Sequence, residues 1–208
     1  MKLRRSAVPV FALLVIALLA CTPLLFSQET VKENSTGKTF PASIVVTHDG
    51  KNVPLTLTGT TVRKKLIIKV YALAHYMQDP PTGEEKDLYA AVLTDGKAKQ
   101  LTMEFVREVG MDKIRGAYRD GFEENCTKEE LSTIAPLIEQ FVGYFATDVK
   151  ENDRFIVRWL PGGVVEAQVQ GIEKPAITNM LFARVLWSIW FGEDSIVDRE
   201  DLVSRFVK

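Results

Sequence analysis

Side chains that could bind an anion or a phenol lie on segments that are otherwise apolar. Arg63 stands at the start of a long, largely apolar strand within Gly59 to Met77, and Tyr118 and Asn125 lie seven residues apart on one helix stripe. A buried guanidinium or phenol without a partner is unfavourable, so this pattern favours a greasy ligand with an anionic or oxygen-bearing head. The residues indicate a binding site more than a particular reaction.

The segments that must position these side chains are strands followed by helices. Apolar and alternating runs predict strands at 40–47, 53–58, 66–77, 101–106, 154–160 and 164–170. The turn sequence Asp49-Gly50 predicts a hairpin between strands 40–47 and 53–58. The apolar composition of residues 66–77 predicts a central strand covered on both faces. Helical spacing predicts helices at 84–93, 111–126, 127–145 and 176–191.

Two signals refine the third of these helices. Thr127 to Glu130 forms a capping box that starts it, and Pro136 is expected to kink or split it. Taken together, the order of the segments predicts an α+β fold with a mainly antiparallel sheet.

Residues 1–28 have the layout of a secretory leader. Lys2, Arg4 and Arg5 precede an uncharged run that ends at Gln28. The sequence Leu18-Leu19-Ala20-Cys21 resembles a lipobox in which Cys21 is lipidated, and the run also has the roughly 20 residues that an uncleaved anchor needs. We therefore expect an exported protein, periplasmic or envelope-associated, that meets a membrane only through its leader or a lipid anchor.

Beyond the leader, residues 29–38 predict a polar linker and residues 39–208 a single domain. The net charge of the whole chain is −1, and without the three basic leader residues it is −4, which does not favour a nucleic-acid surface. Cys126 is the one cysteine after the leader, so we expect no structural disulfide. His48 and His75 lack neighbours at metal-ligand spacing, so we expect no metal site.

Several segments resemble the chalcone isomerase-like family, specifically its bacterial exported members. Each match is weak alone, but the matches keep the family's order and spacing over most of the domain: Gly59 to Lys65, Lys69 to Tyr76, Tyr118, Glu124 to Cys126 and, more loosely, Leu186 to Gly192. The resemblance implies an open-faced antiparallel sheet wrapped by helices, with a ligand cleft between sheet and helices.

The resemblance also implies roles for individual residues. Active isomerases cyclise a chalcone without a cofactor, and Arg63 and Tyr118 match their catalytic arginine and tyrosine, which hold the phenolate and the carbonyl oxygen. Asn125 matches a substrate-contacting asparagine. Tyr71 stands in place of a threonine. Ile189 stands in place of a substrate-contacting hydroxyl residue, so the site would be apolar at that position. Other relatives bind fatty acids, with the same arginine and tyrosine gripping a carboxylate.

Three functions remain open at this stage. The expected one is binding of a small apolar ligand with an acidic or phenolic head, for which Arg63 supplies charge and Tyr71, Tyr118 and Asn125 supply hydrogen bonds. The second is an isomerase or intramolecular lyase that acts on a chalcone-like enone. The third is a non-catalytic envelope interaction protein whose cleft is filled by its own side chains. Simpler interpretations also exist for single residues, such as a helix cap for Asn125.

Overall fold

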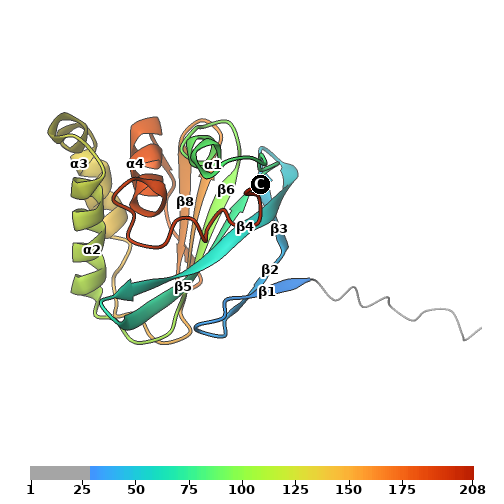
Figure 1. Cartoon of the computed structure of the whole chain (residues 1–208). Helices are drawn as coiled ribbons and strands as arrows, with labels where there is room; N and C mark the ends of the chain where they lie inside the picture. The colour runs from blue at the N-terminus through green and yellow to red at the C-terminus, as the bar shows by residue number, and fades with distance from the viewer. Residues whose placement is uncertain (1–28) are drawn as a thin grey trace, which may run out of the picture.

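A curved antiparallel sheet forms the centre of the molecule (Figure 1). It is seen in a computed structural model that describes residues 29–208, so the predicted leader and Cys21 lie outside the described residues. The strands are β1 (Thr30–Lys32), β2 (Thr39–Pro41), β3 (Ser43–His48), β4 (Lys51–Lys65), β5 (Ile68–Met77), β6 (Lys99–Phe105), β7 (Arg154–Leu160), β8 (Val164–Val169), β9 (Ile172–Glu173) and β10 (Ile177–Thr178).

The order of the strands follows from short antiparallel connections. The main sheet has the order β10-β8-β7-β6-β5-β4-β3, β9 pairs with β8 at its side, and β1 and β2 form a separate hairpin. Asp49 and Gly50 both have positive φ angles, of 49° and 70°, as the predicted turn between β3 and β4 requires. The α+β, mainly antiparallel fold predicted from the sequence is confirmed.

Alternation along the strands divides the core into two clusters. On β5, Tyr71 and Leu73 face the helices, whereas Ala72 and Tyr76 face a smaller cluster on the opposite side of the sheet. Every β5 residue from Tyr71 to Met77 is buried, so the predicted two-sided burial of this strand is confirmed.

Helices cover one face of the sheet (Figure 1). The described residues form α1 (Glu85–Val92), α2 (Met111–Glu124), α3 (Lys128–Val142) and α4 (Met180–Phe191). The predicted capping box of α3 is present, with Thr127 and Glu130 satisfying each other's backbone N–H groups. Within residues 29–208, no helix is both long and apolar enough to cross a membrane.

Some boundaries differ from the sequence prediction. Helix α3 runs through Pro136 without a break, so the predicted split is wrong. The last helix starts at Met180 rather than at residue 176, because Asn179 caps it by accepting a hydrogen bond from the Phe182 N–H (2.9 Å). Residues 29–38, predicted to be a polar linker, instead contain β1 and the turn that leads to β2.

The segment from Gly59 to Met77 is a hairpin rather than one strand. Arg63 therefore lies near the end of β4, not at the start of the following strand, and the chain reverses at Leu66 and Ile67. The reversal makes Arg63 the direct cross-strand partner of Tyr71.

The C-terminal segment after α4 crosses β4 (Figure 1) and is bonded to it. The Arg205 N–H donates to the Thr58 carbonyl (3.1 Å), and the Thr58 hydroxyl donates to the Leu202 carbonyl (2.6 Å). The crossing is close at Gly59, where an added Cβ would lie 1.9 Å from the Asp201 carbonyl oxygen. Only glycine allows this approach, since both colliding groups are backbone.

We expect Gly59→Ala to destabilise the fold, because the new methyl group must push two backbone segments apart. Overpacking of this kind costs about 1–3 kcal/mol of unfolding free energy. Gly116→Ala is the control: an added Cβ meets nothing within 4 Å there, and alanine in a helix is about 1 kcal/mol better than glycine. Urea denaturation of both variants measures the effect, and equal stability of Gly59→Ala and wild type would contradict it.

Candidate functional site

A cavity of about 530 Å³ opens between the end of the β4–β5 hairpin and helix α2. Its volume lies within the roughly 300–1,000 Å³ that small-molecule sites occupy. Much of its wall is apolar and comes from β5, β6, α2 and α4, with Val70, Phe105, Ile114, Ile189 and Trp190 as members. The sheet and the helices thus enclose a space suited to an apolar molecule.

Arg63 reaches this cavity from β4. Its guanidinium donates to the carbonyl of Ile196 in the C-terminal segment, which holds the half-buried side chain in place. Within residues 29–208, no carboxylate lies within ion-pair distance of this guanidinium. An arginine has five N–H donors in a planar fork, so several remain for an anion.

Tyr71 lines the cavity beside Arg63. The indole N–H of Trp190 donates to its hydroxyl oxygen (3.1 Å), which leaves the phenolic proton free to be donated. Burial raises the pKa of Tyr71 to about 12, although the Trp190 hydrogen bond and the Arg63 charge act in the opposite direction. The phenol is therefore a neutral donor at physiological pH.

Tyr118 approaches the same cavity from α2. Its ring stacks on Phe145 with the centroids 5.0 Å apart. Its hydroxyl meets the thioether sulfur of Met103 at 3.8 Å, and sulfur is a weak acceptor. Burial raises the pKa of Tyr118 well above its ordinary value, and neighbouring Tyr71 adds to the shift. A carboxylate or phenolate oxygen would be a stronger acceptor for this proton than the sulfur.

The remaining two predicted site residues differ in their placement. Ile189 is fully buried and forms part of the cavity wall, where it packs against Gly121 of α2. Asn125 is not among the residues that line the cavity. Its amide donates to the Gly121 carbonyl (2.9 Å) at the end of α2, so it occupies the helix-capping position that was the simpler interpretation.

Sequence reasoning missed two components of the site. Trp190 is a core residue whose indole N–H also orients Tyr71. A buried tryptophan usually finds a partner for this N–H, and that tendency was the available signal. The carbonyl of Ile196 had no sequence signal, because any residue could supply it.

Charged residues surround the mouth of the cavity. Lys65, Arg107 and Lys113 contribute positive charge, whereas Glu108, Asp120 and Glu124 contribute negative charge. The interior differs from the rim, since its three polar groups, on Arg63, Tyr71 and Tyr118, are all hydrogen-bond donors. Such an interior can stabilise an oxyanion on an otherwise apolar molecule.

We expect stability to fall at high pH in a way that depends on Tyr71. Its pKa is about 12 in the folded protein and about 10 in an unfolded chain. Because the folded value is higher, this contribution is complete below pH ~10 and is lost as the pH rises toward ~12. Two pKa units correspond to about 2–3 kcal/mol.

Denaturant unfolding between pH ~9 and ~12 compares wild type with Tyr71→Phe. The variant should lose less stability over this range, because it has no proton to release at that position. The same pH dependence in both proteins would show that Tyr71 is not held in the described environment.

Comparisons with known proteins agree with this architecture. The family described as chalcone isomerase-like matches residues 32–201. The crystal structure of a fatty-acid binding protein from Arabidopsis thaliana superposes with a TM-score of 0.68 at 21% identity, over 84% of this chain and 96% of that one. The comparison with curated proteins found no match. The structural likeness bears on the fold, whereas the family match spans most of the sequence, and by that match the chain belongs to the chalcone isomerase-like family.

Proposed function

We propose that this chain is an exported protein that binds a small apolar molecule with an acidic head, such as a fatty acid, in the cavity beneath α2. The observation that carries the proposal is the convergence of Arg63, Tyr71 and Tyr118 on one largely apolar space. The Arabidopsis thaliana protein of the same fold is named a fatty-acid binding protein, which supports the same class of ligand.

The chemistry of the three donors fits a carboxylate. A guanidinium can offer two parallel N–H groups to a carboxylate, and such charge-assisted pairs are stronger than neutral hydrogen bonds. Tyr118 could exchange the Met103 sulfur for a carboxylate oxygen. Val70, Phe105 and Ile189 would then contact the alkyl chain, whose removal from water supplies most of the affinity.

Export is the second part of the proposal, and it is supported by the sequence pattern of residues 1–28. Basic residues followed by a long uncharged run are typical of a leader or an anchor. A protein placed in the cell envelope by such a segment would meet lipids and their breakdown products, which include molecules of the proposed ligand class.

Cyclisation of a chalcone is the alternative, because Arg63 and Tyr118 line the same cavity. Two features favour binding instead. Tyr71 replaces the threonine of active isomerases and is held by Trp190, and Asn125 caps α2 rather than facing the cavity. Since Ile189 also replaces a hydroxyl residue, the substrate contacts that the resemblance implied are incomplete at three positions.

We expect Arg63→Ala to weaken palmitate binding about 10- to 100-fold, because hydrogen bonds to charged groups contribute about 1.5–3 kcal/mol. Lys64→Ala is the matched control: Lys64 is the next residue along β4, it is exposed, and it does not line the cavity. Isothermal titration of both variants measures the affinities. Equal weakening by the two changes would indicate a general charge effect and contradict the proposed site.

Native mass spectrometry of the chain purified from its host identifies the natural ligand. A fatty acid present in wild type and absent from Arg63→Ala is the expected result. Failure of wild type to bind palmitate, together with chalcone cyclisation that disappears in Arg63→Ala, would replace the proposal with the isomerase alternative.

A further inference from the structure

The end of the β4–β5 hairpin exposes three consecutive aliphatic side chains. Leu66 is 91% exposed, Ile67 93% and Ile68 48%. The other exposed large apolar residues within 29–208 stand singly in the sequence, as is ordinary on a protein surface. Leu66 also has a φ of +57°, in the left-handed region, where glycine or asparagine would be less strained. A contiguous apolar tip indicates an interaction surface.

Lysines flank this tip in the sequence. Lys64 and Lys65 precede it, Lys69 follows it, and the sequence from Gly59 to Gln78 contains no acidic residue. Aliphatic side chains flanked by lysines are typical of segments that insert shallowly into an anionic lipid surface. Protein interfaces, in contrast, are depleted in lysine and enriched in aromatic residues. The composition therefore favours lipid over a protein partner.

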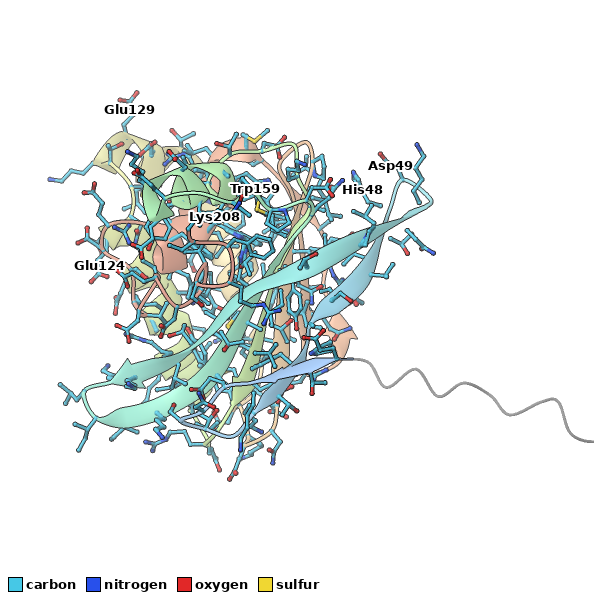
Figure 2. The ribbon with its side chains drawn as sticks, turned by 45° about the vertical axis from the view of Figure 1, so that its right-hand side comes forward. His48, Asp49, Glu124, Glu129, Trp159 and Lys208 are labelled. Atoms are coloured by element: carbon cyan, nitrogen blue, oxygen red, sulfur yellow. The ribbon has the colours of Figure 1, made fainter. Side chains whose placement is uncertain are left out.

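The tip is also part of the cavity mouth. Lys65, Leu66 and Ile68 line the cavity, and Lys65 is the cross-strand partner of Ile68. In Figure 2 the end of the hairpin extends beyond the helices at the lower left of the molecule, clear of the main body. A surface that contacts the tip would consequently lie next to the opening.

We propose that the β4–β5 hairpin tip docks on an anionic lipid surface and places the cavity mouth against it. Leu66 and Ile67 enter the region below the headgroups, and the flanking lysines contact lipid phosphates. If the proposed function holds, the ligand passes between bilayer and cavity along Leu66 and Ile68, without exposure of its alkyl chain to water. The lipid contact itself does not require that function.

A tryptophan placed at the tip tests the contact in the full chain. Ile67→Trp and the control Ile172→Trp, at a site of 62% exposure on β9, are mixed with phosphatidylcholine vesicles that contain brominated lipid, with or without phosphatidylglycerol. The native Trp159, Trp187 and Trp190 are buried and give a common background. We expect a blue shift and loss of emission for Ile67→Trp in anionic vesicles, reduced by salt, and no change for the control.

Three results would overturn the proposal. Quenching that is equal at both positions would mean that another part of the chain brings the protein to the vesicle. Absence of quenching at both positions would mean that the tip does not enter lipid. An emission shift of Ile67→Trp that depends on protein concentration without vesicles would identify the tip as a protein interface.

Ile67→Asp separates this proposal from the proposed function. Ile67 does not line the cavity, so the palmitate affinity of Ile67→Asp should match that of Ile172→Asp. Uptake of palmitate from anionic vesicles should be slower for Ile67→Asp than for Ile172→Asp. Equal uptake rates would refute the lipid-docking role. If wild type does not bind palmitate, the proposed function is refuted but the lipid contact is not, because the quenching experiment needs no palmitate.

Discussion

Burial of α4 between the sheet and the other helices is the interaction on which the rest of the structure depends. Nine of its twelve residues are buried, and all but Arg184 and Ser188 are apolar, because neighbouring elements cover most of its surface. It contacts α1, α2, α3 and β8. Its aromatic residues are buried in the core, and Trp190 also lines the cavity, where its indole N–H donates to the Tyr71 hydroxyl. The packing that stabilises the fold therefore also fixes the orientation of one ligand-binding group.

The candidate site resolves a conflict between burial and polarity. Removing an arginine and two phenols from water is unfavourable unless their donors find acceptors. The structure provides modest partners: a carbonyl for Arg63 and a thioether for Tyr118, while the Tyr71 oxygen accepts from an indole. The polar groups are thus held in position without being neutralised. Rigid packing of this kind prepares a site for an anion, since little further ordering is needed on binding.

Much of the fold could be predicted from local patterns. Strand β7 alternates as expected, with Phe155, Val157 and Trp159 buried, and the capping box of α3 forms as read. Errors occurred where a local signal competes with long-range contacts. Pro136 is accommodated within α3, and residues 29–38 gain order because β1 pairs with β2. Contacts with residues distant in the sequence determine the structure of these segments, and such contacts cannot be predicted from a short stretch of sequence.

For the site, the sequence by itself determined the residue types, the family resemblance and the strand and helix stripes that carry Tyr71, Tyr118 and Ile189, whereas it placed Arg63 on the strand that follows β4. Only the tertiary structure decided which of these meet. The reversal at Leu66 sets the register that pairs Arg63 with Tyr71, and the C-terminal segment supplies the Ile196 carbonyl from 133 positions away. The structure also shows that Asn125 caps helix α2. Register depends on turn geometry as well as on the hydrophobic pattern, and a backbone partner such as the Ile196 carbonyl has no signature in the local sequence.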